Sequence, residues 1–174
     1  MMYNENQPIM KKNILLKGIL MMSIVVLGLA ACSKEEKVSD KIASNYSGYT
    51  AATFSYSPRT MYTAGEKVVV KSEGEKTVSV TLTSQRWGTA TFNAVKVTDG
   101  SKAALSGSGT IAMPTMGGQV NTYDASIAGT IALDKSSAEL NINVPAVMGG
   151  VNIAFKTGTM PDTSTAAHVI ISNE

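Results

Sequence analysis

Cys32 is the only cysteine in the chain, and its neighbours suit a thiol that becomes covalently modified. It follows Leu29, Ala30 and Ala31, so an apolar run ends in small side chains directly before it. Small residues at this place fit the groove of a signal peptidase, and an ordinary secretory signal needs no cysteine there. The pattern predicts cleavage after Ala31 and attachment of lipid to the Cys32 sulfur.

The segment before Cys32 has the composition of an export signal. Lys11, Lys12 and Lys17 supply positive charge on the amino-terminal side, and no charged residue occurs in 18–31. That apolar run is shorter than the roughly 20 residues a membrane-spanning helix needs. Residues 1–31 are therefore predicted to be a lipoprotein signal peptide. The alternative, an uncleaved membrane helix with a buried thiol, is disfavoured because polar sequence begins directly after the cysteine.

Residues 32–45 are predicted to be a lipidated amino terminus followed by a polar tether. Ser33 stands where an aspartate commonly retains lipoproteins in the inner membrane. Lys34, Glu35 and Glu36 resemble the export signal of surface lipoproteins in Bacteroidetes, although a solvated linker rich in lysine and glutamate would look similar. We expect the chain to be held by lipid of the outer membrane through Cys32.

The reactive and charged residues in the rest of the chain argue against an enzyme. His168 is the only histidine and lies in the predicted carboxyl-terminal tail, 159–174. Because Cys32 is used for lipid, neither a cysteine–histidine pair nor a cysteine-rich zinc site is available. After Cys32, basic and acidic residues are equal in number, so no basic patch indicates nucleic acid. We expect no catalytic residues, no metal and no cofactor.

Strand-like alternation runs through most of the mature chain. The segment 138–144 is the clearest case, with apolar side chains on one face and polar side chains on the other. We expect eight strands, at 47–57, 65–72, 76–84, 88–98, 102–112, 120–133, 137–144 and 150–157. One-sided alternation over so many segments predicts an antiparallel sheet with one buried face.

The joints between these segments are short and rich in turn residues, which predicts consecutive hairpins. Eight hairpin-linked strands bury one apolar face most simply by closing into an up-and-down barrel. We therefore expect a single all-β, eight-stranded antiparallel up-and-down barrel at 46–158. A change of apolar parity near Asn93 and Ala94 predicts a β-bulge there.

Three segments resemble a known family: 86–92 (RWGTATF), 105–110 (LSGSGT) and 144–150 (VPAVMGG). They are similar to segments of the calycin-like β-barrel lipoproteins of Bacteroides and relatives, and the likeness extends over about residues 45–158. The resemblance implies an eight-stranded barrel on a surface or periplasmic lipoprotein. It assigns no chemistry to a residue. Together with the export signal it favours the outer membrane, in its outward-facing leaflet.

Four residues are expected at the barrel mouth: Trp87, Met113, Met116 and Met148. In an up-and-down barrel the joints after the fifth and seventh strands share one end, so their methionines can converge. Apolar closure of the mouth is the favoured interpretation. The alternatives are a soft rim around a pocket and a thioether site for copper or haem. For Trp87, closure of the barrel is favoured over stacking on a sugar.

The last prediction concerns the interior of the barrel. Small residues on the inward parity of the fifth and sixth strands, among them Gly107 and Ala125, suggest a hollow there, with Tyr56 and Tyr123 as hydroxyl partners of a ligand. Two functions follow. The first is a surface barrel that binds a small apolar or glycan-derived molecule. The second is a structural or interaction protein whose filled barrel contacts another envelope protein through its loops.

Overall fold

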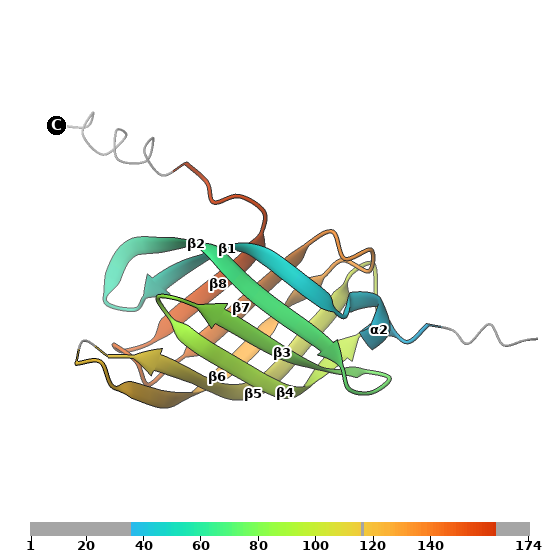
Figure 1. Ribbon diagram of the computed structural model, residues 1–174, viewed down its shortest axis with the longest axis horizontal. Helices are drawn as coiled ribbons and strands as arrows, with labels where there is room; N and C mark the ends of the chain where they lie inside the picture. The colour runs from blue at the N-terminus through green and yellow to red at the C-terminus, as the bar shows by residue number, and fades with distance from the viewer. Residues whose placement is uncertain (1–35, 116, 163–174) are drawn as a thin grey trace, which may run out of the picture. The chain divides into compact units, whose positions relative to one another are not determined.

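The structure, a computed structural model, describes residues 36–115 and 117–162, which form one short helix and a run of strands (Figure 1). The elements are α2 (Val38–Ile42), β1 (Ser44–Phe54), β2 (Ser57–Ser72), β3 (Thr77–Ser84), β4 (Gly88–Thr98), β5 (Ala103–Pro114), β6 (Val120–Ile131), β7 (Ala138–Val144) and β8 (Val151–Thr157). The amino-terminal segment 1–35 and the segment 163–174 lie outside the described residues, as do the predictions made for Cys32, Lys34, Glu35 and His168.

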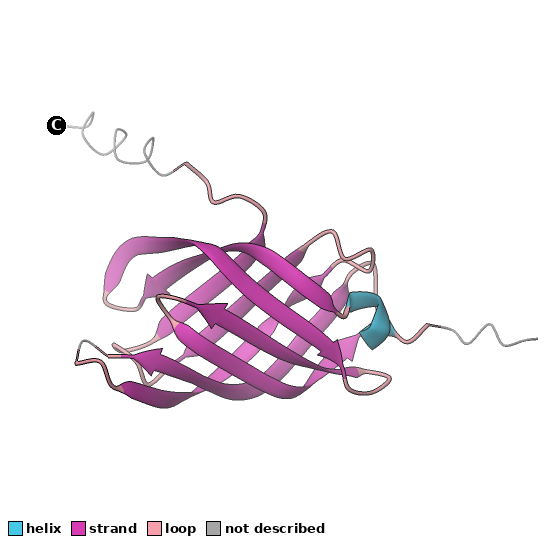
Figure 2. Ribbon diagram, in the orientation of Figure 1, coloured by secondary structure: helices cyan, strands magenta, loops and turns pink. Residues whose placement is uncertain are grey.

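The eight strands close into a barrel in which each strand pairs with its neighbours in sequence (Figure 2). All pairs are antiparallel, and β1 closes the barrel against β8, for example at Phe54 opposite Val151. The all-β, up-and-down barrel expected from the short turns is confirmed. Closure leaves no strand at an open edge of the sheet.

The interior is apolar because each strand presents alternate side chains to it. In β7 the buried residues Ala138, Leu140, Ile142 and Val144 alternate with exposed polar ones. Branched and aromatic side chains fill the space, the largest fully buried strand residues including Phe92, Phe155, Leu82, Ile111 and Ile127. Phenylalanine rings and branched side chains of several strands therefore form one packed core.

Two β-bulges change which residues face inward. Ala94 has a φ of 51°, and the pairing of β4 with β5 shifts register between Thr91 and Lys96, which confirms the predicted bulge. A second bulge lies at Gly65, whose φ of 74° favours glycine, and it was not predicted. Directly after this bulge, Glu66 points into the barrel and is 1 % exposed.

The predicted polar tether is wrong for its last residues, because the chain is already folded from Val38 onward. Val38 and Ile42 are one helical turn apart in α2 and are both buried, so this short helix packs into one end of the barrel. Ser39 donates a hydrogen bond to the carbonyl of Gly74 in the β2–β3 turn. Tyr46 donates a second bond, of 2.7 Å, to the carbonyl of Ile42.

The expected loop at 58–64 is also wrong. β2 begins at Ser57 and pairs with β1 from there, so Ser55 and Tyr56 form the turn of a tight hairpin. Pro58 lies at the start of β2 and Gly65 at the bulge. Among the described residues, no helix is long and apolar enough to cross a membrane.

Candidate functional site: a pocket at the open end of the barrel

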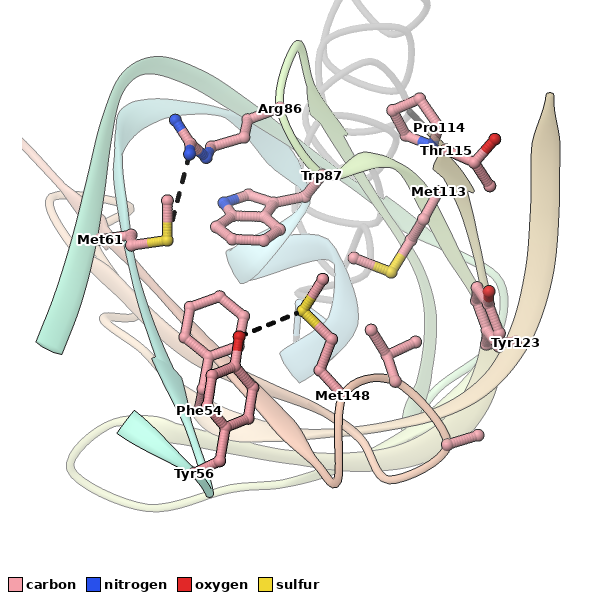
Figure 3. A pocket seen from close by; sticks show the side chains of 12 residues that line it. Phe54, Tyr56, Met61, Arg86, Trp87, Met113, Pro114, Thr115, Tyr123 and Met148 are labelled. Atoms are coloured by element: carbon pink, nitrogen blue, oxygen red, sulfur yellow. Dashed lines mark hydrogen bonds between the residues drawn. The ribbon is translucent and has the colours of Figure 1, made fainter. Parts of the chain in front are cut away.

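A cavity of about 540 Å³ lies at the end of the barrel opposite α2 (Figure 3). Its walls are mostly aromatic rings, thioethers and aliphatic groups, with one cationic side chain. The lining residues are Phe54, Tyr56, Met61, Arg86, Trp87, Met113, Pro114, Thr115, Tyr123, Ala146, Val147 and Met148.

Four hairpins supply these residues: β1–β2, β3–β4, β5–β6 and β7–β8. In an up-and-down barrel alternate hairpins share an end, so these four converge although they are far apart in sequence. The β2–β3 turn lies at the other end, where Gly74 accepts a hydrogen bond from Ser39 beside α2 (Figure 1). The barrel is therefore closed by a helix at one end and hollowed at the other.

Trp87 forms the floor of the pocket. Its side chain is 6 % exposed, and its indole N–H donates a hydrogen bond of 3.2 Å to the Thr50 hydroxyl inside the barrel. Phe54 packs beside it, with ring centroids 6.1 Å apart, and Tyr56 continues the row at 5.6 Å from Phe54. The floor is thus the Trp87 ring, held from below by a buried hydrogen bond, and the Phe54 and Tyr56 rings continue from it along one wall.

The turn that carries Trp87 is held by Ser84. The Ser84 hydroxyl accepts hydrogen bonds from the backbone N–H groups of Trp87 (2.9 Å) and Arg86 (3.2 Å). It donates its own proton to Glu66 Oε1 at 2.9 Å. A buried carboxyl group is therefore linked to the turn that positions the two pocket residues.

Glu66 occupies an unfavourable site for a charge. Its Oε2 atom is buried and has no hydrogen-bond partner among the described residues. Burial raises the pKa of the Glu66 carboxyl above its ordinary value, and the hydrogen bond from Ser84 only partly offsets this. Thr63, also on β2, has a buried hydroxyl without a partner in the described part of the chain.

Arg86 provides the positive charge of the lining. Its guanidinium carbon lies 5.7 Å from the centroid of the Trp87 ring, a cation–π arrangement. Its Nη2 atom contacts Met61 Sδ at 4.0 Å, which is a weak acceptor (Figure 3). The described residues place no carboxylate within ion-pairing distance of this guanidinium.

The structure brings together most of the residues that the sequence suggested for the mouth. Trp87, Met113 and Met148 line the pocket, and Met148 Sδ accepts a hydrogen bond of 3.4 Å from the Tyr56 hydroxyl. Tyr123, expected at an interior hollow, lies at the mouth as well. Met116 lies outside the described residues. The methionines thus form part of a pocket wall.

At Gly107 and Gly109 the described residues leave no room for the interior hollow expected beside β5 and β6. A Cβ atom on Gly107 would lie 3.1 Å from a methyl group of Val95, and one on Gly109 only 2.2 Å from the Thr91 carbonyl oxygen. β4 therefore approaches β5 so closely that only glycine fits. Gly107 lies in this packed wall, whereas Ala125 lines a separate, shallow cavity of about 360 Å³ between β6 and the end of β7.

Met61, Arg86 and Glu66 are among the residues of the site that were not singled out from the sequence. Arg86 could have been found, because it directly precedes the tryptophan in a short hairpin joint. Glu66 could have been found from alternation, because it shares the inward parity of Val68 and Val70 in the strand predicted at 65–72.

Comparison with known proteins agrees with this geometry. The model of the calycin-like β-barrel domain family matches residues 42–159, which contain all of β1 to β8. A comparison with curated proteins finds no match. Among solved structures, that of a "putative outer membrane protein" from Bacteroides fragilis is similar, with a TM-score of 0.61 and 28 % identity. The match covers 72 % of this chain and 48 % of the other, so this chain spans about half of that protein's length. The chain belongs to the calycin-like β-barrel domain family.

Proposed function

We propose that this chain is a lipid-anchored protein of the bacterial outer membrane, exposed at the cell surface, whose barrel binds a small apolar molecule at its mouth. The observation that carries the binding function is the cavity of about 540 Å³. Pockets for small ligands occupy about 300–1,000 Å³ and are lined mainly by apolar and aromatic side chains. The mouth pocket has this size and this lining.

The pocket is also preorganised to bind a ligand. Its floor is the Trp87 ring, fixed by the hydrogen bond to Thr50, and one wall is the row of Phe54 and Tyr56. A rigid floor lowers the entropic cost of binding, whereas the flexible methionine side chains adapt to different shapes. Stacking of a sugar ring on Trp87 is less well supported, because Phe54 and Arg86 already flank the indole.

The proposed location rests on two kinds of similarity. Lys34, Glu35 and Glu36 follow Cys32 as in surface lipoproteins, and the Bacteroides fragilis neighbour is named for the outer membrane. We propose that acylated Cys32 inserts in outer-membrane lipid. We further propose a binding role without catalysis, since the titratable groups that line the pocket are a guanidinium and two phenols.

A second candidate function is contact with another envelope protein. It is favoured by the exposed apolar tips of the same hairpins, where Tyr56 is 67 % and Met148 is 58 % exposed. Exposed apolar groups that cluster at one place commonly mark an interaction site. In this case the pocket rim, and not its interior, would carry the function.

Native mass spectrometry of the protein purified from its own host distinguishes the two candidates. A ligand-binding protein retains a small molecule, and its mass adduct disappears in the variant Ala146→Trp, which fills the mouth from the β7–β8 loop. Ala128→Trp on the outer face of β6 is the matched control and keeps the adduct. Absence of any adduct, together with a cross-linked envelope protein at Tyr56, would favour the interaction role.

A further inference from the structure

The mouth pocket has an uneven distribution of charge. Its lining contains one arginine and no aspartate or glutamate, and the remaining side chains are apolar, phenolic or a threonine hydroxyl. From this distribution we infer that the ligand is a small organic anion: its apolar body lies on Phe54, Trp87 and Met113, and its carboxylate or sulfonate group binds Arg86. This inference rests on the proposed binding function.

Arg86 is free to bind an anion and is already held in place. The Ser84 hydroxyl fixes its backbone N–H, and its guanidinium lies over the Trp87 ring. An arginine has five N–H donors, and the recorded side-chain contact of Arg86 uses one of them on Met61 Sδ. The remaining donors can form the paired hydrogen bonds that arginine makes with a carboxylate.

The other polar groups of the pocket are less suited than Arg86 to bind the anionic group of a ligand. The Tyr56 hydroxyl donates to Met148 Sδ, and the Tyr123 oxygen accepts a bond of 3.3 Å from the Asn121 amide. Both phenol groups already have hydrogen-bond partners and carry no charge, so they are weaker partners for an anion than Arg86. Arg86 is exposed to solvent, so an anion reaches it without crossing the apolar floor.

A soft metal cation is the competing occupant. Met61, Met113 and Met148 all line the pocket, and thioethers are ligands for Cu(I). However, a guanidinium that contacts Met61 Sδ repels a cation at the same place. The charge of the lining therefore favours an anion over a metal ion.

Two fluorescent probes with nearly the same apolar body test the inference. Anilinonaphthalene sulfonate is an anion, and N-phenylnaphthylamine is its neutral counterpart. Trp87 is the only tryptophan of the chain and lines the pocket, so quenching of its emission by energy transfer reports a bound probe, and the response to Arg86→Gln assigns the probe to this site. We expect the anion to bind about tenfold more tightly than the neutral probe, as one charge-assisted hydrogen-bonded contact would give.

Arg86→Gln should remove that preference. The anion should lose about tenfold more affinity than the neutral probe loses. Lys67→Gln, on the outer face of β2, removes the same charge away from the pocket and serves as the control. The anion's affinity should also fall with added salt in the unsubstituted protein and less so in Arg86→Gln.

The outcomes separate the two proposals. If both probes bind equally, or if Arg86→Gln leaves the anion's affinity unchanged, the anion inference is wrong and the apolar pocket stands. If the anion is displaced by Cu(I) at low concentration, the metal is the preferred occupant and the inference fails. If neither probe quenches Trp87, the proposed ligand-binding function is itself overturned. Near-ultraviolet circular dichroism of each variant checks that the barrel is folded.

Discussion

The indole N–H of Trp87 donates a hydrogen bond of 3.2 Å to the hydroxyl of Thr50, across the inside of the barrel from β3–β4 to β1. Both side chains are buried, so water cannot replace either partner. This bond joins the packed interior to the pocket above it. It determines the height at which the ring closes the barrel and hence the depth of the pocket.

Thr50→Val should destabilise the protein by about 1–3 kcal/mol, because it leaves the buried indole N–H without a partner while keeping the shape of the side chain. Denaturation in urea measures the loss. Thr83→Val on the exposed face of β3 is the control and should have little effect. Equal stabilities of the two variants would show that the bond contributes nothing to folding.

Gly109→Ala should be far more harmful than Gly107→Ala. A methyl group on Gly109 would lie 2.2 Å from a backbone oxygen and 2.6 Å from the Phe92 ring, whereas at Gly107 its contacts are longer, 3.1 Å to a methyl group and 3.2 Å to the Cα of Val95. We expect Gly109→Ala to cost about 3 kcal/mol or more and Gly107→Ala about 1 kcal/mol. Thermal unfolding ranks them, and the opposite order would contradict the close approach of β4 to β5.

Glu66→Gln should stabilise the barrel at neutral pH and flatten its pH dependence. Because burial raises the pKa of Glu66, the folded state keeps this proton longer than the unfolded state. The free energy of unfolding should therefore fall as pH rises above about 4.3, the ordinary glutamate value, and level off above the raised pKa. Glu66→Gln should lack this decline. Glu75→Gln, at an exposed position, should retain it.

Tyr46→Phe should loosen α2, since it removes the hydrogen bond of 2.7 Å to the Ile42 carbonyl. A loss of about 1 kcal/mol is expected. Burial, with a smaller contribution from Asp134, raises the pKa of Tyr46 to about 12. Stability should therefore fall between about pH 10, where tyrosine ionises in the unfolded chain, and pH 12. Tyr46→Phe should lack this part of the alkaline decline, and Tyr62→Phe should keep it.

Cys32→Ser should release the protein from membranes or stop processing of its leader. Multiple acyl chains hold a protein firmly, because each buried CH₂ contributes about 0.8 kcal/mol. Replacement of Lys34, Glu35 and Glu36 by alanine should leave attachment intact and remove surface exposure. Fractionation and protease treatment of whole cells measure the two effects. Outer-membrane attachment of a normally cleaved Cys32→Ser protein would refute the anchor.

Local alternation was sufficient to predict the barrel. Residues such as Leu140 and Ile142 alternate with polar neighbours, and short joints leave few other topologies. The convergence of Met113 and Met148 also followed from counting hairpins. These features depend only on sequence spacing, so they could be predicted without coordinates.

The space inside the barrel could not be predicted in this way. Gly107 and Gly109 suggested a hollow, but the missing side chains are replaced by Val95 and Phe92 of the neighbouring strand. Whether a glycine leaves a void or admits another strand depends on contacts between residues far apart in sequence. The change of inward parity along β2 likewise depends on the bulge at Gly65. The helix α2 was not predicted, because its residues lie in a segment rich in charged side chains.

The position of α2 has a consequence for how a ligand would arrive. Val38 is six residues after Cys32, so an extended chain allows at most about 20 Å between them. If Cys32 is acylated, the helix-closed end of the barrel is the one tied near the bilayer, and the pocket is at the far end. A ligand would then be loaded from the aqueous phase, or handed over by a soluble carrier, and not extracted sideways out of the membrane.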